Sequence, residues 1–293
     1  MLTTQTTTAP DAPVEAAAPV APRPWLAAGT LVSREWVRFI RQRNRVVGAI
    51  GQPLIFWLLF GAGLGPSFRL PGSTDESISY REYFFPGSLA LILLFTAIFA
   101  TISIIEDRRE GFLQSVLVAP LPRWSMVLGK LLGGTLLALA QGLLFLFLGW
   151  LLGIQIGLAA LAAIVALLFV LGLGLTALGF VIAWRMDSTQ GFHAIMSVFL
   201  MPMWLLSGAF FPPPVWQVSL SWGQKLLALV MMANPLTYGV AALRRLIYAG
   251  TAAAIPQDTP SLLVCWLVTL GFAALMFALA WKIAAQRTTG DLL

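Results

Sequence analysis

The densest run of ionisable side chains in this chain is Glu106-Asp107-Arg108-Arg109-Glu110. Gly111 and an amphipathic stretch over 112–117 follow, and Pro120 and Pro122 stop that stretch. A charged run joined to a short helix along the membrane surface can bind a cytoplasmic partner protein through ion pairs and apolar contacts. A plain connecting loop explains the same residues about as well.

A second group of basic side chains is spaced by four, three and four residues. The group consists of Arg34, Arg38, Arg41 and Arg45. On a helix over 25–45 this spacing places the arginines opposite an apolar face. The apolar face consists of Gly29, Val32, Trp36, Phe39 and Ile40. We predict an amphipathic helix on the cytoplasmic membrane surface with its basic face toward anionic lipid headgroups; a solvated helix is the alternative.

The residues that an enzyme or an ATPase needs are missing from the sequence. No GxxxxGK[ST] motif occurs, because Leu131 follows Gly129-Lys130. The sequence has a single cysteine, Cys265, which excludes a cysteine-cluster metal site and a disulfide framework. It has a single histidine, His193, and no Ser–His–Asp arrangement is recognisable around it. We therefore expect no catalytic residue, no metal and no cofactor in this chain.

The elements that carry these residues follow from composition. The 293 residues are 59% hydrophobic and 10% charged, whereas soluble domains run at about 45–50% and about 25%. A membrane-spanning helix needs about 20 apolar residues. We predict an all-α polytopic membrane protein with six transmembrane helices, at roughly 46–65, 86–105, 127–152, 156–184, 192–211 and 261–281. No span has a charged residue in its interior, and Lys130 is expected in the first turn of the third span.

The distribution of Lys and Arg predicts the orientation. With the N-terminus inside, thirteen of the 18 basic residues lie on the inner side and the remaining five on the outer side, which fits the excess of positive charge in cytoplasmic loops. Residues 1–24 are rich in Thr, Ala and Pro and predict a disordered cytoplasmic tail without a secretory signal. Residues 46–293 form one transmembrane domain with an inner loop at 106–124, and both termini are cytoplasmic.

The outer segment 212–260 is long and far from polar. Two short helical stretches, 223–232 and 236–248, are separated by Asn234-Pro235. Neither is long enough to cross a membrane, so we predict a re-entrant helical hairpin in the outer leaflet before the last span, with Arg244 near its exit. A seventh and an eighth span are the alternative, and length counts against them.

The absence of ionisable groups at depth argues against an ion-coupled transporter. The energy for any transport is then expected from outside the chain, and the cargo is expected to be amphipathic or lipid-like. The polar side chains within the spans are Thr96, Thr101, Ser103, Gln141, Thr176, Ser197 and Ser207. For any single one of them, hydrogen bonding between helices is the favoured explanation.

With these features in place, the layout resembles the permease subunits of type-2 ABC exporters, the ABC-2 family, especially drug-resistance permeases of the daunorubicin type. The family's inner-loop pattern is matched by Glu106, Arg109, Gly111, Leu117, Pro120, Gly129 and Lys130. Its later pattern is matched by Asn234, Pro235, Tyr238 and Arg244. One departure is Gln114, where the family commonly has Glu. The resemblance covers nearly the whole chain from Trp25.

The resemblance implies a division of labour. Two copies, or one copy and a relative, enclose a pathway, while two separate ATPase subunits bind ATP and Mg. The inner loop acts as the coupling helix, and the N-terminal helix braces the same contact. The implied coupling residues are Glu106, Asp107, Arg108, Arg109, Glu110, Gly111, Phe112 and Leu113. The second and fifth spans line the pathway, with Phe95, Thr96, Phe99, Phe199, Met203 and Trp204.

Two other functions stay open at this point. A permease of the same fold could export a polysaccharide or a lipid-linked glycan, which aromatic rows along a wide tunnel would favour. An integral membrane acyltransferase would need an acid–base cluster that the sequence does not display. Membrane lipids are expected as partners, and nucleic acid is not.

Overall fold

The computed structural model describes residues 23–65, 79–214, 221–249, 255–256 and 259–286, without the side chains of residues 43–46, 49 and 50. Every regular element in these ranges is a helix. The elements are α1 (Pro24–Arg41), α2 (Arg43–Leu64), α3 (Tyr80–Ala100), α4 (Ile102–Arg109), α5 (Phe112–Val118), α6 (Arg123–Leu151), α7 (Leu158–Ala183), α8 (Thr189–Trp204), the π-helical segment η2 (Leu205–Ala209), α9 (Trp222–Ala233), α10 (Pro235–Ile247) and α11 (Leu262–Ala285). The predicted tail, 1–24, lies outside the described residues except for its last two.

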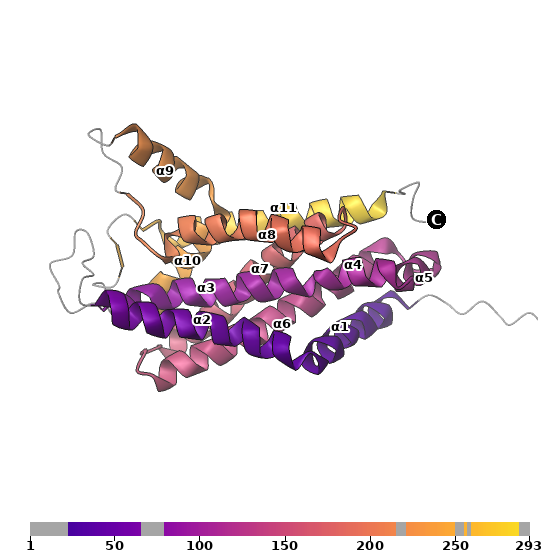
Figure 1. Ribbon diagram of the computed structural model, residues 1–293, viewed down its shortest axis with the longest axis horizontal. Helices are drawn as coiled ribbons and strands as arrows, with labels where there is room; N and C mark the ends of the chain where they lie inside the picture. The colour runs from indigo at the N-terminus through magenta and orange to yellow at the C-terminus, as the bar shows by residue number, and fades with distance from the viewer. Residues whose placement is uncertain (1–22, 66–78, 215–220, 250–254, 257–258, 287–293) are drawn as a thin grey trace, which may run out of the picture.

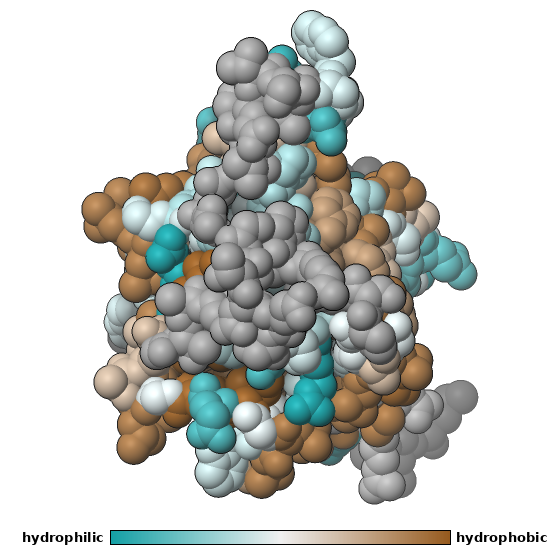
Figure 2. Space-filling view, turned by 90° about the vertical axis from the view of Figure 1, so that its left-hand side faces the viewer, coloured by the Kyte–Doolittle hydropathy of each residue, from teal (hydrophilic) through white to brown (hydrophobic). Residues whose placement is uncertain are grey.

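The long helices run side by side along one axis (Figure 1). Helices α1 and α5 lie at one end of this bundle, which we call the α5 end, while α9 and the α6–α7 turn lie at the other, the α9 end (Figure 1). Seen from the α9 end, hydrophobic residues make up much of the periphery (Figure 2). Large apolar side chains such as Phe147, Val198 and Leu267 are exposed there. Such a periphery suits a lipid environment.

Five helical segments are long and apolar enough to cross a membrane: Tyr80–Arg109, Arg123–Leu151, Leu158–Ala183, Thr189–Ala209 and Leu262–Ala285. They match the second to the sixth predicted spans. Helices α9 and α10 are bent by 77° and could together form one more crossing or a re-entrant loop. The first predicted span falls in α2, whose described apolar stretch, Gly51–Leu64, is shorter than a crossing. The all-helical membrane class and five to six spans are thereby confirmed.

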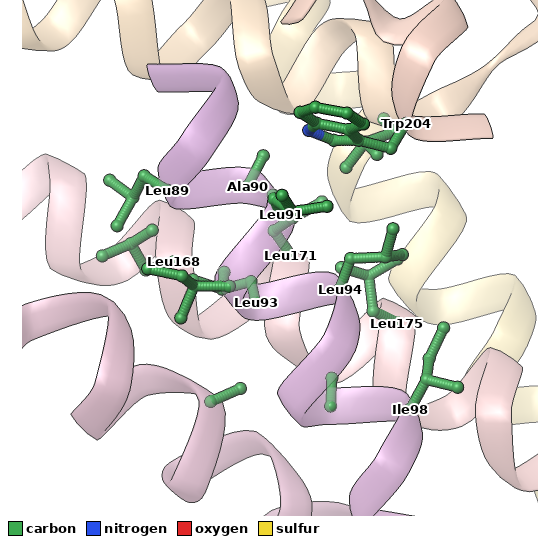
Figure 3. Close-up of a cluster of buried hydrophobic side chains, with 14 of the residues drawn as sticks. Leu89, Ala90, Leu91, Leu93, Leu94, Ile98, Leu168, Leu171, Leu175 and Trp204 are labelled. Carbon is green, nitrogen blue, oxygen red and sulfur yellow. The ribbon is translucent and has the colours of Figure 1, made fainter. Parts of the chain in front are cut away.

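Helix α3 is the central element of the bundle. Its leucines interdigitate with Leu168, Leu171 and Leu175 of α7, and Trp204 closes the same cluster (Figure 3). Lipid is as apolar as leucine, so close packing rather than escape from water must hold these helices together. Gly87 shows how close: a Cβ there would lie 2.6 Å from the Cβ of Ala209. Segment η2 therefore packs directly on the backbone of α3.

The predicted N-terminal helix over 25–45 is corrected by the structure. Helix α1 ends at Arg41, Gln42 is non-helical with φ −91° and ψ 70°, and Arg45 belongs to α2. The chain bends because the two helices pack on different neighbours. Helix α1 lies in a recess of α6, where a Cβ on Gly129 would meet the carbonyl oxygen of Ala28 at 2.8 Å, while α2 lies along α3 (Figure 1).

The second predicted span is also longer than expected. The helix bends slightly at Thr101, whose hydroxyl donates to the carbonyl oxygen of Ile98 at 2.6 Å, and then continues as α4 to Arg109. Gly111 separates α4 from α5 with φ +76°, a conformation that other residues rarely adopt. The first four charged residues of the run therefore extend a long helix, and only α5 matches the expected short helix of the inner loop.

Candidate functional site

Seven ionisable side chains meet at the α5 end and form what we call the α5-end charge cluster. Its members are Arg34, Glu35 and Arg38 of α1, Glu106, Asp107 and Glu110 at the end of α4, and Lys130 of α6. Five of these seven residues also belong to the two charged groups that the sequence singled out, but the sequence did not predict that the two groups pair with each other. Three helices that are far apart in sequence are joined here through their side chains.

Asp107 is the centre of the cluster, and its side chain is 0% exposed. Arg34 binds both carboxylate oxygens, with N–O distances of 2.9 Å and 2.7 Å. Arg38 donates to Oδ1 at 2.9 Å, and Lys130 donates to Oδ2. A buried carboxylate is tolerated only when its charge and its lone pairs are matched in this way. Asp107 therefore holds α1 and α6 against α4.

Lys130 has all three of its donors satisfied. Its Nζ binds Asp107, Glu35 Oε1 at 2.5 Å and Ser103 Oγ at 3.2 Å. The expectation that Lys130 lies in the first turn of a span was wrong, because α6 begins at Arg123 and the side chain is only 7% exposed. The expectation of spans without interior charge fails for the same reason. The charge is tolerated because two carboxylates accompany it.

The predicted contact of the basic face with lipid headgroups is corrected for two of its arginines. Arg34 and Arg38 turn toward α4, and Arg38 also pairs with Glu106 at 3.2 Å and Glu110 at 3.3 Å. A buried carboxylate offers an arginine a stronger partner than a solvated headgroup. Arg41 is exposed, Trp36 is half-buried, and the side chain of Arg45 lies outside the described residues.

Arg34 also connects the cluster to α5. Its guanidinium lies 3.8 Å from the centroid of the Phe112 ring, the first residue of α5. Partial burial alone would lower the pKa of Arg34, but the hydrogen bond and negative charge of Asp107 outweigh it and raise that pKa above its usual value. Arg34 thus stays charged while it contacts both α4 and α5.

The other two arginines of the run point to a different place, the turn between α7 and α8. Arg108 donates to the carbonyl oxygens of Trp184 at 2.5 Å and Met186 at 3.2 Å. Arg109 donates through Nε to the carbonyl oxygen of Asp187 at 3.2 Å. The start of α8 is thereby attached to the end of α4.

Burial divides the predicted coupling residues. Asp107 and Leu113 are buried within this chain, so neither can touch another protein in this conformation. Phe112 and Gly111 are half-buried, and Arg109 and Glu110 are exposed. The exposed side of α5 carries Ser115 and Val118, the latter 71% exposed, which sequence reasoning did not select. The helical spacing of α5, which places these two residues on the face opposite Leu113, could have identified them.

The residues predicted for the outer hairpin surround the start of α10. Asn234 caps α10 by accepting from the backbone N–H of Leu236, and its Nδ2 donates to the carbonyl oxygen of Met203 at 2.6 Å. Pro235 is the first residue of α10, and the hydroxyl of Tyr238 donates to the carbonyl oxygen of Met232. Arg244 does not lie at an exposed exit, because only 3% of it is exposed.

The predicted pathway residues do not form one surface. Thr96 is buried and hydrogen-bonded to Gln141, and Trp204 is buried with its Nε1 donating to the carbonyl oxygen of Gly87 at 2.8 Å. These two pack inside a single chain rather than along its periphery. Phe95, Phe99 and Met203 are half-buried, and Phe199 is 49% exposed.

The comparisons with known proteins agree on one family. The family model described as ABC-2 type transporter matches residues 27–248. A putative transport permease, ycf38, of Cyanophora paradoxa is 28% identical over 220 residues, which cover 73% of this chain and 71% of that protein. A probable multidrug ABC transporter permease, YbhR, of Escherichia coli K12 is 30% identical over 154 residues, 50% of this chain and 41% of that protein.

Proposed function

This chain belongs to the ABC-2 type transporter family, and on that premise we propose that it is the permease of an exporter that moves a hydrophobic or amphipathic substrate outward. Separate ATPase subunits hydrolyse the ATP, since the sequence carries no P-loop of its own. A relative named as a multidrug permease supports this class of substrate. The apolar helices make the chain an integral membrane protein.

The α5-end charge cluster is the observation that carries the proposal. An ATPase that pushes on the exposed side of α5 displaces Phe112, and with it the guanidinium of Arg34. Arg34 shares Asp107 with Lys130, so the displacement reaches α1, α4 and α6 together. Buried ion pairs suit this role because separating them uncovers charge in a poorly solvated environment. Force then enters the spans through side-chain contacts rather than through a nucleotide site.

In this proposal the α5 end faces the cytoplasm, and two copies of the chain enclose the pathway. The inner placement of most Lys and Arg residues supports the orientation. Helix α8 has an exposed apolar face with Ile195, Val198 and Phe199. That face is available to a second copy, to substrate or to lipid. Of the predicted pathway residues, Phe199 fits the proposal best.

Reconstitution with a candidate ABC ATPase tests the division of labour. The purified permease alone is expected to hydrolyse no ATP, and the pair is expected to hydrolyse ATP and to transport Hoechst 33342 into inside-out vesicles. An ATPase with its P-loop lysine replaced is the matched control and should give neither activity. ATP hydrolysis by the permease alone would contradict the proposal. Stimulation of the pair by a lipid-linked glycan, without dye transport, would favour the glycan permease instead.

Cysteine labelling tests the orientation in a Cys265→Ala background, where the buried native thiol is removed. Val118→Cys on the exposed side of α5 should react with a membrane-impermeant maleimide only from the cytoplasmic side. Gly223→Cys, where a new Cβ meets nothing within 4 Å, should react only from outside. Intact cells and inside-out vesicles provide the two sides. Reversed labelling of this pair would overturn the orientation.

A further inference from the structure

Helix α8 ends in a break at the α9 end of the bundle. In η2, Leu206 has φ −88° and ψ 16°, and Gly208 has φ +74° and ψ 11°. The last carbonyl groups of a helix have no backbone partners within it, and in an apolar environment they must find other donors. Three carbonyl groups around this break, those of Met203, Gly208 and Phe210, accept hydrogen bonds from side chains of other elements; we call these three the α8 carbonyl collar.

Side chains from two other elements donate to every member of the collar. From α3, the hydroxyl of Tyr80 donates to Phe210 at 2.9 Å and that of Tyr83 donates to Gly208 at 2.9 Å. From α10 and its cap, Asn234 donates to Met203 at 2.6 Å and Arg244 donates to Gly208 at 3.1 Å. Thr237 donates its one hydroxyl proton to the carbonyl oxygen of Met231 at 2.7 Å. The break is therefore held from both sides.

Arg244 is the unusual donor of this set. Its Nη2 lies between the carbonyl oxygens of Gly208 and Tyr83, the latter at 3.3 Å, and its guanidinium lies 4.2 Å from the centroid of the Tyr83 ring. Among the described residues no carboxylate lies within 4 Å of it, and its Nε is buried without a hydrogen-bond partner. Burying a cation among neutral groups alone costs free energy of folding. The role of Arg244 therefore lies in the segment that it holds.

The opposite end of α8 is attached differently. Between Thr189 and Leu200 only Phe192, Met196 and Leu200 are buried, about one residue per turn. The segment just before α8 accepts hydrogen bonds from Arg108 and Arg109 of α4. A helix that packs along one narrow line can swing with little loss of contact, whereas the collar end cannot move without breaking four hydrogen bonds.

We propose that α8 turns about the α8 carbonyl collar as a pivot, with Arg244 as the positioning residue that fixes it, and that Arg108 and Arg109 move its other end. This inference rests on the proposed function, because the motion of α4 would come from an ATPase acting on α5. Swinging α8 about one end changes where its exposed face, with Ile195 and Phe199, is presented, while the hydrogen bonds to Gly208 are kept.

Two matched pairs of spin labels test the pivot in the complex of permease and ATPase. In the Cys265→Ala background, Ala194→Cys with Trp281→Cys reports on the α5 end, and Leu205→Cys with Leu263→Cys reports on the α9 end. All four positions are exposed, and excess unlabelled protomer keeps one labelled pair in each complex. Trapping with ATP and vanadate is expected to shift the distance of the first pair and to leave the second unchanged.

The variants at Arg244 separate positioning from simple packing. Arg244→Met should broaden the distance distribution of the α9-end pair and abolish the shift of the α5-end pair, while ATP hydrolysis continues. Arg244→Lys keeps the positive charge and one nitrogen donor group, so it should restore both the narrow distribution and the shift. If Arg244→Met does not fold, Tyr83→Phe removes one donor to Gly208 and should broaden the same α9-end distribution. Wild-type distances in whichever of these two variants folds would overturn the pivot.

Failure of this inference is distinguishable from failure of the proposed function. If trapping shifts both pairs equally, or shifts neither while ATP is hydrolysed and the dye transported, the pivot is wrong and the exporter stands. If no ATPase binds and neither pair responds to nucleotide, the exporter proposal is wrong and the pivot falls with it.

Discussion

Asp107→Ala is expected to destabilise the protein by about 3–5 kcal/mol, the usual consequence of removing one partner from a buried ion pair, and to abolish ATP-driven transport. The substitution leaves Arg34, Arg38 and Lys130 without their shared carboxylate. The three cations then repel one another where α1, α4 and α6 meet. Thermal unfolding in detergent measures the stability, and dye transport by the reconstituted complex measures the coupling.

Two further variants make this prediction specific. Asp187→Asn changes an almost fully exposed aspartate whose nearest cation, Arg108, is 3.4 Å away, and exposed pairs contribute about 0–1 kcal/mol. It should leave unfolding and transport near wild type. The double variant Asp107→Ala, Lys130→Met removes the buried cation with its partner and should recover part of the stability. An Asp107→Ala protein with wild-type stability and transport would show that the cluster transmits nothing.

Gly111→Val is expected to abolish transport while the protein still inserts into the membrane. Gly111 connects α4 to α5 with φ +76°, and a side chain in that conformation costs about 1–2 kcal/mol. The strain is relieved by a change of backbone conformation, which turns α5 away from Arg34. Partner-stimulated ATP hydrolysis and dye transport are the measurements, with protein yield in the membrane fraction to confirm insertion.

The chain offers a matched control for this variant. Gly153 in the α6–α7 turn also has a positive φ, +98°, and a Cβ there meets nothing within 4 Å. Gly153→Val therefore introduces a similar backbone strain at the α9 end of the bundle, far from α5 (Figure 1). Transport should survive it. Equal loss in both variants would mean that strain in any turn impairs the protein, and that α5 has no special part in coupling.

Much of the fold follows from local features of the sequence. Runs of apolar residues locate the second to the sixth spans, because their length alone suits a membrane. Gly111 and Pro120 bound a short helix, and Asn234-Pro235 begins another, because glycine and proline restrict the backbone wherever they occur. The spacing of Arg34, Arg38 and Arg41 predicted one face of a helix. The end of that helix at Arg41 could not be predicted, because the bend at Gln42 depends on what α1 and α2 each pack against.

The sequence by itself therefore predicted an all-helical membrane protein of the ABC-2 type, which the family match and the apolar helices confirm. Only the tertiary structure decided which partners the charges have. Arg34 and Asp107 are 73 residues apart, Lys130 and Glu35 are 95 apart, and Arg244 and Tyr83 are 161 apart. A charged side chain within a span is unfavourable unless a group of opposite charge or a hydrogen-bond partner accompanies it. Which groups accompany it depends on how whole helices pack together, and no local sequence pattern contains that information.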